Sequence, residues 1–156
     1  MNEADNVILD HFRGIRGRTL EMLDFVPDEL LGRTAEGEEH PLCWQFAHIA
    51  SGVNWWMHYV MNDGLGWVND YPSRKEAVRD GLIASRDRLV SFFAADDGEA
   101  MGRVFTMSEE KEPEGGVVEW IGRDRVLYLT AHELHHLGRA ELALWQFGMT
   151  GTPDFP

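Results

Sequence analysis

The chain reads RDRVLYLTAHELHHLGRAELALWQF over residues 123–147. Its apolar residues recur at three- and four-residue steps, which indicates one long amphipathic helix, and Gly148 follows as the expected left-handed C-cap. At the helical repeat, His132 and His136 fall on one strip beside the apolar arc, whereas His135 falls on the other side. We therefore predict that His132 and His136 point into the protein and that His135 lies at its rim or in solvent.

A histidine pair at this spacing is suited to holding a metal ion. Residues four apart on a helix differ by about 40° around the axis and by roughly 6 Å along it, so His132 and His136 can both reach one ion. The ion needs a further ligand, because catalytic zinc sites usually take three from the protein. His48 is the best candidate, since it lies at the edge of the apolar face of a second helical stretch, residues 41–61. Weaker candidates are His11, His40 and His58.

Aromatic residues and a glycine surround His48 in this second stretch. Gly52 comes one turn later and is expected to leave open space beside the imidazole. The pattern predicts a substrate pocket with aromatic walls next to the metal ligands, although aromatic residues are also common in cores and dimer interfaces. The predicted pocket residues are Trp44, Gly52, Trp55, Trp56 and Tyr59.

Glu133 falls near the middle of the apolar arc, where an unpaired carboxylate would be costly to bury. It needs a partner, which the metal site, an imidazole N–H or an arginine could supply. Residues 132–136 also match H-E-x-x-H, the zincin pattern in which the glutamate is the general base. Arg139 argues against a protease of the longer pattern, which has glycine at that place. A metal-dependent hydrolase with Glu133 as its base stays open.

The remaining sequence predicts an all-α fold, a four-helix bundle formed by one domain over residues 1–156. A chain of this length can bury most of the surface that its unfolded state exposes. Ser73 and Glu76 form a capping-box pattern that predicts the start of the third helix. The predicted helices cover residues 4–24, 41–61, 73 to near 96, and 123–147, with a short extra turn over 27–31.

A long irregular connection, residues 96–122, is expected before the last helix. Connections of this length are uncommon in compact domains and often form lids or mobile loops. Two interpretations carry equal weight: a solvated crossover, or a lid in which Phe105, Met107 or Trp120 folds over the metal cavity.

Two segments resemble a known family. FAHIASGVNWW (residues 46–56) and AHELHHLGR (131–139) are together similar to the DinB/YfiT-like metalloenzymes. The resemblance implies a four-helix bundle, commonly a homodimer, with one divalent ion, zinc or nickel, bound by one histidine of the second helix and two of the fourth. Arg139 departs from the family, which often has glutamine there. Matched position by position, the implied ligands are His48, His132 and His136.

The resemblance also implies an activity. Some members of the family transfer a low-molecular-weight thiol, such as bacillithiol or mycothiol, and three neutral imidazoles leave a metal its full charge to activate a thiol. The partner would be a small-molecule electrophile, with Arg139 available to bind the thiol cofactor and Arg125 as a second candidate. The alternatives are the hydrolase that uses Glu133 and a non-catalytic metal-binding stress protein.

Composition narrows the setting. A formal net charge of -13 argues against binding of nucleic acids, whose phosphates are contacted by Lys and Arg. The single cysteine, Cys43, is expected to be a small buried residue rather than part of a disulfide. No apolar stretch predicts a membrane span, and the N-terminal residues have no signal-peptide pattern, so a cytoplasmic location is expected.

Overall fold

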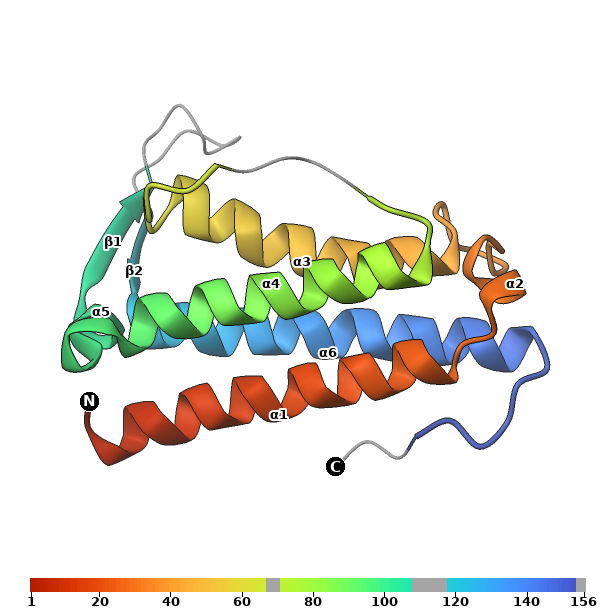
Figure 1. Ribbon diagram of the computed structural model, residues 1–156, viewed down its shortest axis with the longest axis horizontal. Coiled ribbons are helices and arrows are strands. Elements are labelled where there is room, and N and C mark those ends of the chain that lie inside the picture. Colours follow the sequence, from red (N-terminus) through yellow and green to blue (C-terminus); the bar gives the residue numbers. More distant parts are fainter. Residues whose placement is uncertain (67–70, 108–117, 154–156) are drawn as a thin grey trace.

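The computed structural model describes residues 1–66, 71–107 and 118–153. Its long helices are α1 (Glu3–Phe25), α3 (Leu42–Tyr59), α4 (Lys75–Ala94) and α6 (Gly122–Gln146), with a short helix α2 (Asp28–Leu31) after α1. The long helices lie side by side as a four-helix bundle, which confirms the predicted fold (Figure 1). α1 and α6 run in one direction, and α3 and α4 run in the other. Because α1 and α3 each pack against both α4 and α6, they occupy opposite corners of the bundle.

The end of α6 is set by a local signal, as predicted. Gly148 has a left-handed backbone with φ of 85°. Its N–H donates to the carbonyl of Trp145 at 3.0 Å, and the N–H of Met149 donates to the carbonyl of Leu144 at 2.9 Å. These two bonds form a Schellman motif, which satisfies carbonyls that the helix itself leaves without partners.

The start of α4 differs from the prediction. Arg74 is the N-cap, with an extended backbone and no side-chain capping bond, so the capping box of Ser73 and Glu76 does not form. The helix begins after Arg74, which leaves Glu76 one position short of the place that a capping box requires. This end makes a tertiary contact instead, because the Lys75 ammonium lies 2.9 Å from the carboxylate of Asp28, the first residue of α2.

The connection before α6 is more regular than expected. After a 3₁₀ turn, η1 (Ala95–Gly98), and a short helix, α5 (Glu99–Gly102), come two antiparallel strands, β1 (Val104–Met107) and β2 (Val118–Ile121). β-branched and aromatic residues make up most of both strands, a composition that favours pairing over an irregular loop. Phe105 pairs in register with Trp120 and is buried in the core, so it does not fold over the histidines. The side chain of Met107 lies outside the described residues.

The core divides into two apolar clusters along the bundle. One contains Phe46, Leu82 and Leu144, and the other contains Phe12 and Leu89. Arg16 of α1, Ser85 of α4 and Glu133 of α6 are also buried inside the bundle, where Arg16 hydrogen bonds to the other two. Cys43 is free and buried, as predicted. Within the described ranges, no helix combines the length and apolar character that crossing a membrane requires.

Candidate metal centre

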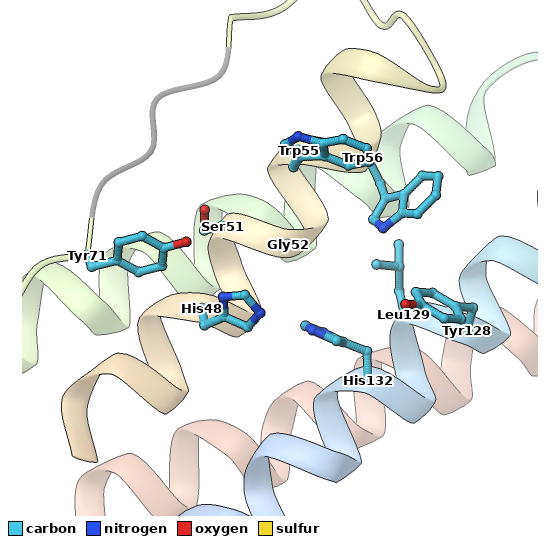
Figure 2. Close-up of a pocket in the computed structure, with 9 residues that line it drawn as sticks. All are labelled: His48, Ser51, Gly52, Trp55, Trp56, Tyr71, Tyr128, Leu129 and His132. Carbon is cyan, nitrogen blue, oxygen red and sulfur yellow. The ribbon is translucent and has the colours of Figure 1, made fainter. Parts of the chain in front are cut away.

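Three histidines converge between α3 and α6. His48 comes from α3, and His132 and His136 come from successive turns of α6. One donor nitrogen from each lies within 4.8 Å of the other two. The ring centroid of His48 is 5.1 Å from that of His132 and 4.6 Å from that of His136. Figure 2 shows His48 and His132 reaching toward one another across the gap between the two helices. His135 is exposed, on the side that the helical repeat predicts.

The spacing of the donor atoms fits a metal ion. The Nε2 atoms of His132 and His136 are 3.2 Å apart. Two nitrogens bound about 2.0–2.1 Å from one tetrahedral zinc ion are separated by roughly 3.3 Å. The Nδ1 atom of His48 is buried without a hydrogen-bond partner among the described residues. The two nitrogens of α6 thus lie at the separation that a shared ion requires, and a donor nitrogen of His48 lies within 4.8 Å of both.

A hydrogen-bonded chain holds His136 from behind. Its Nδ1 atom lies 2.7 Å from Oε1 of Gln45, and Nε2 of Gln45 donates to Glu38 at 3.1 Å. Because the amide nitrogen of Gln45 is engaged by a carboxylate, its oxygen faces the ring, and Nδ1 of His136 must be the donor. Nε2 of His136 therefore carries a lone pair and points toward His132. This is the tautomer that a metal ligand needs.

Arg139 belongs to the same chain of contacts. Its Nε and Nη2 atoms donate to the two carboxylate oxygens of Glu38 at 3.1 and 2.5 Å. The charge that was expected to bind a thiol cofactor is therefore already paired. Arg139 binds the carboxylate of Glu38, and that carboxylate in turn orients Gln45. Arg139 therefore acts on His136 through two intervening side chains.

The environment keeps the three imidazoles neutral. Burial is the main reason that the pKa of His48 falls to about 4 and that of His136 to about 3, and repulsion from neighbouring imidazoles is the second cause. Burial, followed by the proximity of His135, also lowers the pKa of His132. All three rings thus keep lone pairs at neutral pH, which is the form that binds a metal.

Gly52 makes room for the ring of His132, in addition to the open space that the sequence predicts beside His48. A Cβ atom at this position would lie 3.1 Å from Cε1 of His132. The ring of His132, from α6, therefore lies directly against Gly52, and Gly52 also lines the open pocket beside His48. The other face of His48 is covered by Trp44, whose ring stacks on the imidazole at 4.3 Å between centroids.

A pocket of about 210 Å³ opens beside His48 and His132 (Figure 2). Of the predicted pocket residues, Gly52, Trp55 and Trp56 line it. Trp44 lies outside the lining, and Tyr59 packs against Trp55 at 5.3 Å between ring centroids. The full lining is His48, Ser51, Gly52, Trp55, Trp56, Tyr71, Tyr128, Leu129 and His132.

Two tyrosines of this lining are absent from the sequence prediction. Tyr128 precedes His132 by one helical turn, so the same spacing that pairs the histidines could have identified it. Tyr71 comes from the segment before α4 and stacks behind His48, at 6.2 Å between centroids. No local pattern points to Tyr71, because only the packing of α4 against α3 brings it to the pocket.

Glu133 does not join the histidines. Its carboxylate is fully buried and pairs with Arg16 of α1, through Nε at 2.7 Å and Nη2 at 3.0 Å. The hydroxyl of Thr19 also donates to it, and Nη1 of Arg16 donates to Ser85 of α4 at 2.7 Å. Of the partners considered for Glu133, the structure provides the arginine. Both oxygens are engaged on the α1 side, so the geometry gives no support to Glu133 as a general base.

The comparisons with known proteins agree with this architecture. A model of the DinB superfamily matches residues 11–140. A DinB-like protein from Bacillus cereus ATCC 10987 has a similar structure, with a TM-score of 0.72 and 18% identity, covering 96% of this chain and 95% of that chain. A DinB-like protein, YjoA from Bacillus subtilis, has a TM-score of 0.58 at 15% identity, with 94% and 96% covered. A comparison with curated proteins finds no match. The structural similarity shows a shared fold, and because the family model spans most of the sequence, the chain belongs to the DinB superfamily.

Proposed function

We propose that this protein is a divalent-metal-dependent enzyme that transfers a low-molecular-weight thiol to a small electrophile. The metal ligands are His48, His132 and His136. The observation that carries the proposal is the convergence of three neutral imidazoles, with donor nitrogens within 4.8 Å of one another, at the wall of an aromatic pocket. Zinc or nickel suits such a ligand set, since imidazole binds both.

The ligand set matches the proposed chemistry. When bound, a divalent ion with three neutral ligands lowers the pKa of a coordinated thiol by several units. In the transfer, the thiolate sulfur forms a bond to the electrophilic carbon, the leaving group departs with its bonding electrons, and the thiol proton passes to solvent. The chain contributes orientation and exclusion of water: Gln45 holds the tautomer of His136, and Trp55 and Trp56 provide apolar wall for the electrophile.

Hydrolysis through Glu133 is the weaker alternative. A general base must reach the proton that it removes, directly or through one water. The carboxylate of Glu133 is held by Arg16 and Thr19 on the α1 side, and it is absent from the described group of residues that can share a metal ion. We therefore assign Glu133 a structural role within this proposal.

The proposed enzyme is a homodimer. Support comes from apolar side chains on the outer face of α6 that stay exposed in the monomer. Leu127, Leu134 and Trp145 are spaced so that they fall on one line along the helix, with Leu142 beside them. Exposed apolar stripes of this kind are typical of protein interfaces.

Metal binding is tested by elemental analysis of protein purified without an affinity tag. We expect about one equivalent of zinc or nickel per chain. Single replacements His48→Ala, His132→Ala and His136→Ala should abolish it. His135→Ala is the matched control, because this exposed histidine belongs to the same helix but lies outside the cluster. Full metal content in the His48→Ala variant would overturn the three-histidine site.

Thiol transfer is tested separately on the metal-loaded protein. Bacillithiol, mycothiol and glutathione are each offered with 1-chloro-2,4-dinitrobenzene, and release of chloride and formation of the thioether are measured. We expect turnover with at least one thiol that is lost in His48→Ala. Stoichiometric metal without turnover for any thiol and electrophile pair would favour the non-catalytic metal-binding protein.

A further inference from the structure

Arg125, in the first turns of α6, is a buried cation without an acceptor. Its side chain is 0% exposed, and its three guanidinium nitrogens have no hydrogen-bond partner in the part of the chain that the structure describes. Arg16, also 0% exposed, is the instructive comparison. It reaches Glu133, Ser85 and the carbonyl of Leu82, so its donors are engaged. The fold therefore satisfies one of these two buried arginines and leaves the other with free donors.

Aromatic rings cover the guanidinium of Arg125. Its Cζ atom lies 3.5 Å from a ring centroid of Trp56, 3.6 Å from one of Trp120 and 4.6 Å from that of Tyr128. Burial lowers its pKa to about 10, so the group remains charged at neutral pH. Cation–π contacts stabilise the charge through the ring faces, but N–H groups radiate in the plane of a guanidinium and need acceptors at its edge. The rings therefore do not replace a hydrogen-bonding anion.

A second donor without a partner lies beside the first. The indole Nε1 atom of Trp120 is buried and makes no hydrogen bond within the described ranges. Trp120 comes from β2 and Arg125 from α6, so two different elements bring unpaired donors together. Buried polar groups are nearly always paired in native structures, and each exception calls for an explanation. A carboxylate, with two acceptor oxygens and a negative charge, would satisfy both donors. The positive end of the α6 dipole favours the same charge.

The aromatic cage around Arg125, formed by Trp56, Trp120 and Tyr128, shares two of its residues with the lining of the pocket. Trp56 and Tyr128 line the pocket, and their rings also contact the guanidinium of Arg125. Figure 2 shows both rings at the end of the pocket away from His48. Arg125 precedes His132 by two helical turns, about 10 Å along the axis, which is the length of a small metabolite. Tyr128 is 45% exposed and is the most exposed of the three rings around Arg125, so we expect a ligand group to enter past its ring.

We propose that the ligand of this pocket carries a carboxylate that Arg125 and the indole N–H of Trp120 bind, behind the rings of Trp56 and Tyr128. The inference rests on the proposed function for the reaction at the histidines and adds the chemical class of the substrate. Binding of the carboxylate itself needs no metal, so the two proposals can fail separately.

The test uses phenylacetate and its neutral counterpart phenylacetamide with metal-free protein at pH 8. Metal-free protein excludes coordination of the carboxylate to an ion. Binding is measured by the change in tryptophan fluorescence, to which Trp56 and Trp120 contribute, and by calorimetry. We expect phenylacetate to bind at least about tenfold more tightly than phenylacetamide, because hydrogen bonds to charged groups are strong when buried. Equal affinity for the two probes, or no binding of phenylacetate, would overturn the proposal.

Matched variants locate the site. Arg125→Gln should weaken phenylacetate binding by about tenfold or more, and Trp120→Phe, which keeps the ring and removes the N–H, should weaken it by a smaller factor. Arg123→Gln is the control, because Arg123 lies on the same turn of α6 and is half-buried beside Asp5. Wild-type affinity in Arg125→Gln would contradict the assignment.

The melting temperature of metal-free Arg125→Met gives a second test, which does not depend on ligand binding. Removing a buried charge that lacks an acceptor should leave the melting temperature unchanged or raise it. A large decrease would show that the guanidinium is a structural part of the core and would overturn the ligand role. Metal analysis of Arg125→Gln distinguishes the two proposals, since this variant should lose affinity for phenylacetate but bind metal as the wild type does, because Arg125 is outside the histidine cluster.

Discussion

Gln45 determines which nitrogen of His136 faces the cluster. The 2.7 Å contact between Oε1 of Gln45 and Nδ1 of His136 places the ring proton on Nδ1 and leaves Nε2 as a lone pair. The orientation of Gln45 is set in turn by Glu38 and Arg139. The side chain of α3 that precedes His48 by one turn thus prepares a ligand of α6. Such outer contacts hold ligand geometry and raise ligand basicity.

Replacing Gln45 should therefore weaken the metal site without touching a ligand. Gln45→Met keeps the volume and removes the acceptor, so we expect affinity for zinc to fall by about 10–100-fold. The double variant Gln45→Glu with Glu38→Gln is the matched control, since the carboxylate at position 45 can accept the same proton and the amide at position 38 removes the repulsion from the Glu38 carboxylate. This control should retain tight binding. Competition with a chromophoric chelator measures both. Unchanged affinity for zinc in Gln45→Met would show that Gln45 does not orient His136.

Gly52→Ala should separate stability from metal binding. In a helix interior alanine is favoured over glycine by about 0.5–1 kcal/mol, so the metal-free protein should melt no lower than wild type. The new Cβ atom would lie 3.1 Å from Cε1 of His132, which must shift the ring and weaken zinc binding. Gly81→Ala is the control, because its Cβ atom would make an ordinary 3.8 Å contact with Ala50. Equal zinc affinity in both variants would show that the ring of His132 adjusts freely.

The ion pair of Arg16 and Glu133 should matter for stability and not for metal content. Glu133→Ala leaves the Arg16 charge buried without its carboxylate, and breaking such a pair costs about 3–5 kcal/mol. Chemical denaturation should show this loss, with a smaller one for Glu133→Gln, which can still hydrogen bond. The double replacement Arg16→Met with Glu133→Leu should recover much of it. If folded Glu133→Gln keeps its metal and loses all turnover, the general-base role returns.

The stability of the metal-free protein should decrease as the pH falls below about 6.5. The pKa values of His48 and His136 are lowered to about 4 and about 3 by burial, so the unfolded chain binds protons before the folded one does. The free energy of unfolding therefore rises with pH across the interval from about 4 to about 6.5 and levels off above it. Denaturant midpoints measured across this interval check the sign. The slope should be smaller in His48→Gln and closer to that of the wild type in His135→Ala, because His135 contributes less than burial to the lowered pKa values of His132 and His136. A flat profile for the wild type would contradict the neutral, buried state of the cluster.

A homodimer through α6 predicts a specific sensitivity to charge. Leu134→Glu places a carboxylate at the centre of the exposed apolar line, where desolvation opposes association. Sedimentation velocity should show a dimer for the wild type and a monomer for this variant. Val7→Glu is the control, because Val7 is also an exposed apolar residue but lies on α1. A wild-type monomer at all accessible concentrations would exclude the proposed dimer.

The periodicity of the sequence was sufficient to predict the helix bundle and two of the three proposed metal ligands. The positions of His132 and His136 on one strip, and of His135 off it, follow from helix geometry, which depends only on residues a few places apart. The cap at Gly148 is equally local, because a left-handed backbone is a property of that residue. His48 could be proposed because it lies on the edge of an apolar face, but its distance from the other two histidines depends on how α3 and α6 pack.

Tertiary packing alone decided the remaining contacts. Arg16 pairs with Glu133 and Gln45 with His136 across different helices, and no repeat in the sequence relates such distant positions. The ring of His132, from α6, lies against Gly52 for the same reason. Local patterns specify which face of each helix is buried. Which residue contacts each buried group is decided only when the helices pack together, because only then do their side chains compete for the same volume and the same hydrogen bonds.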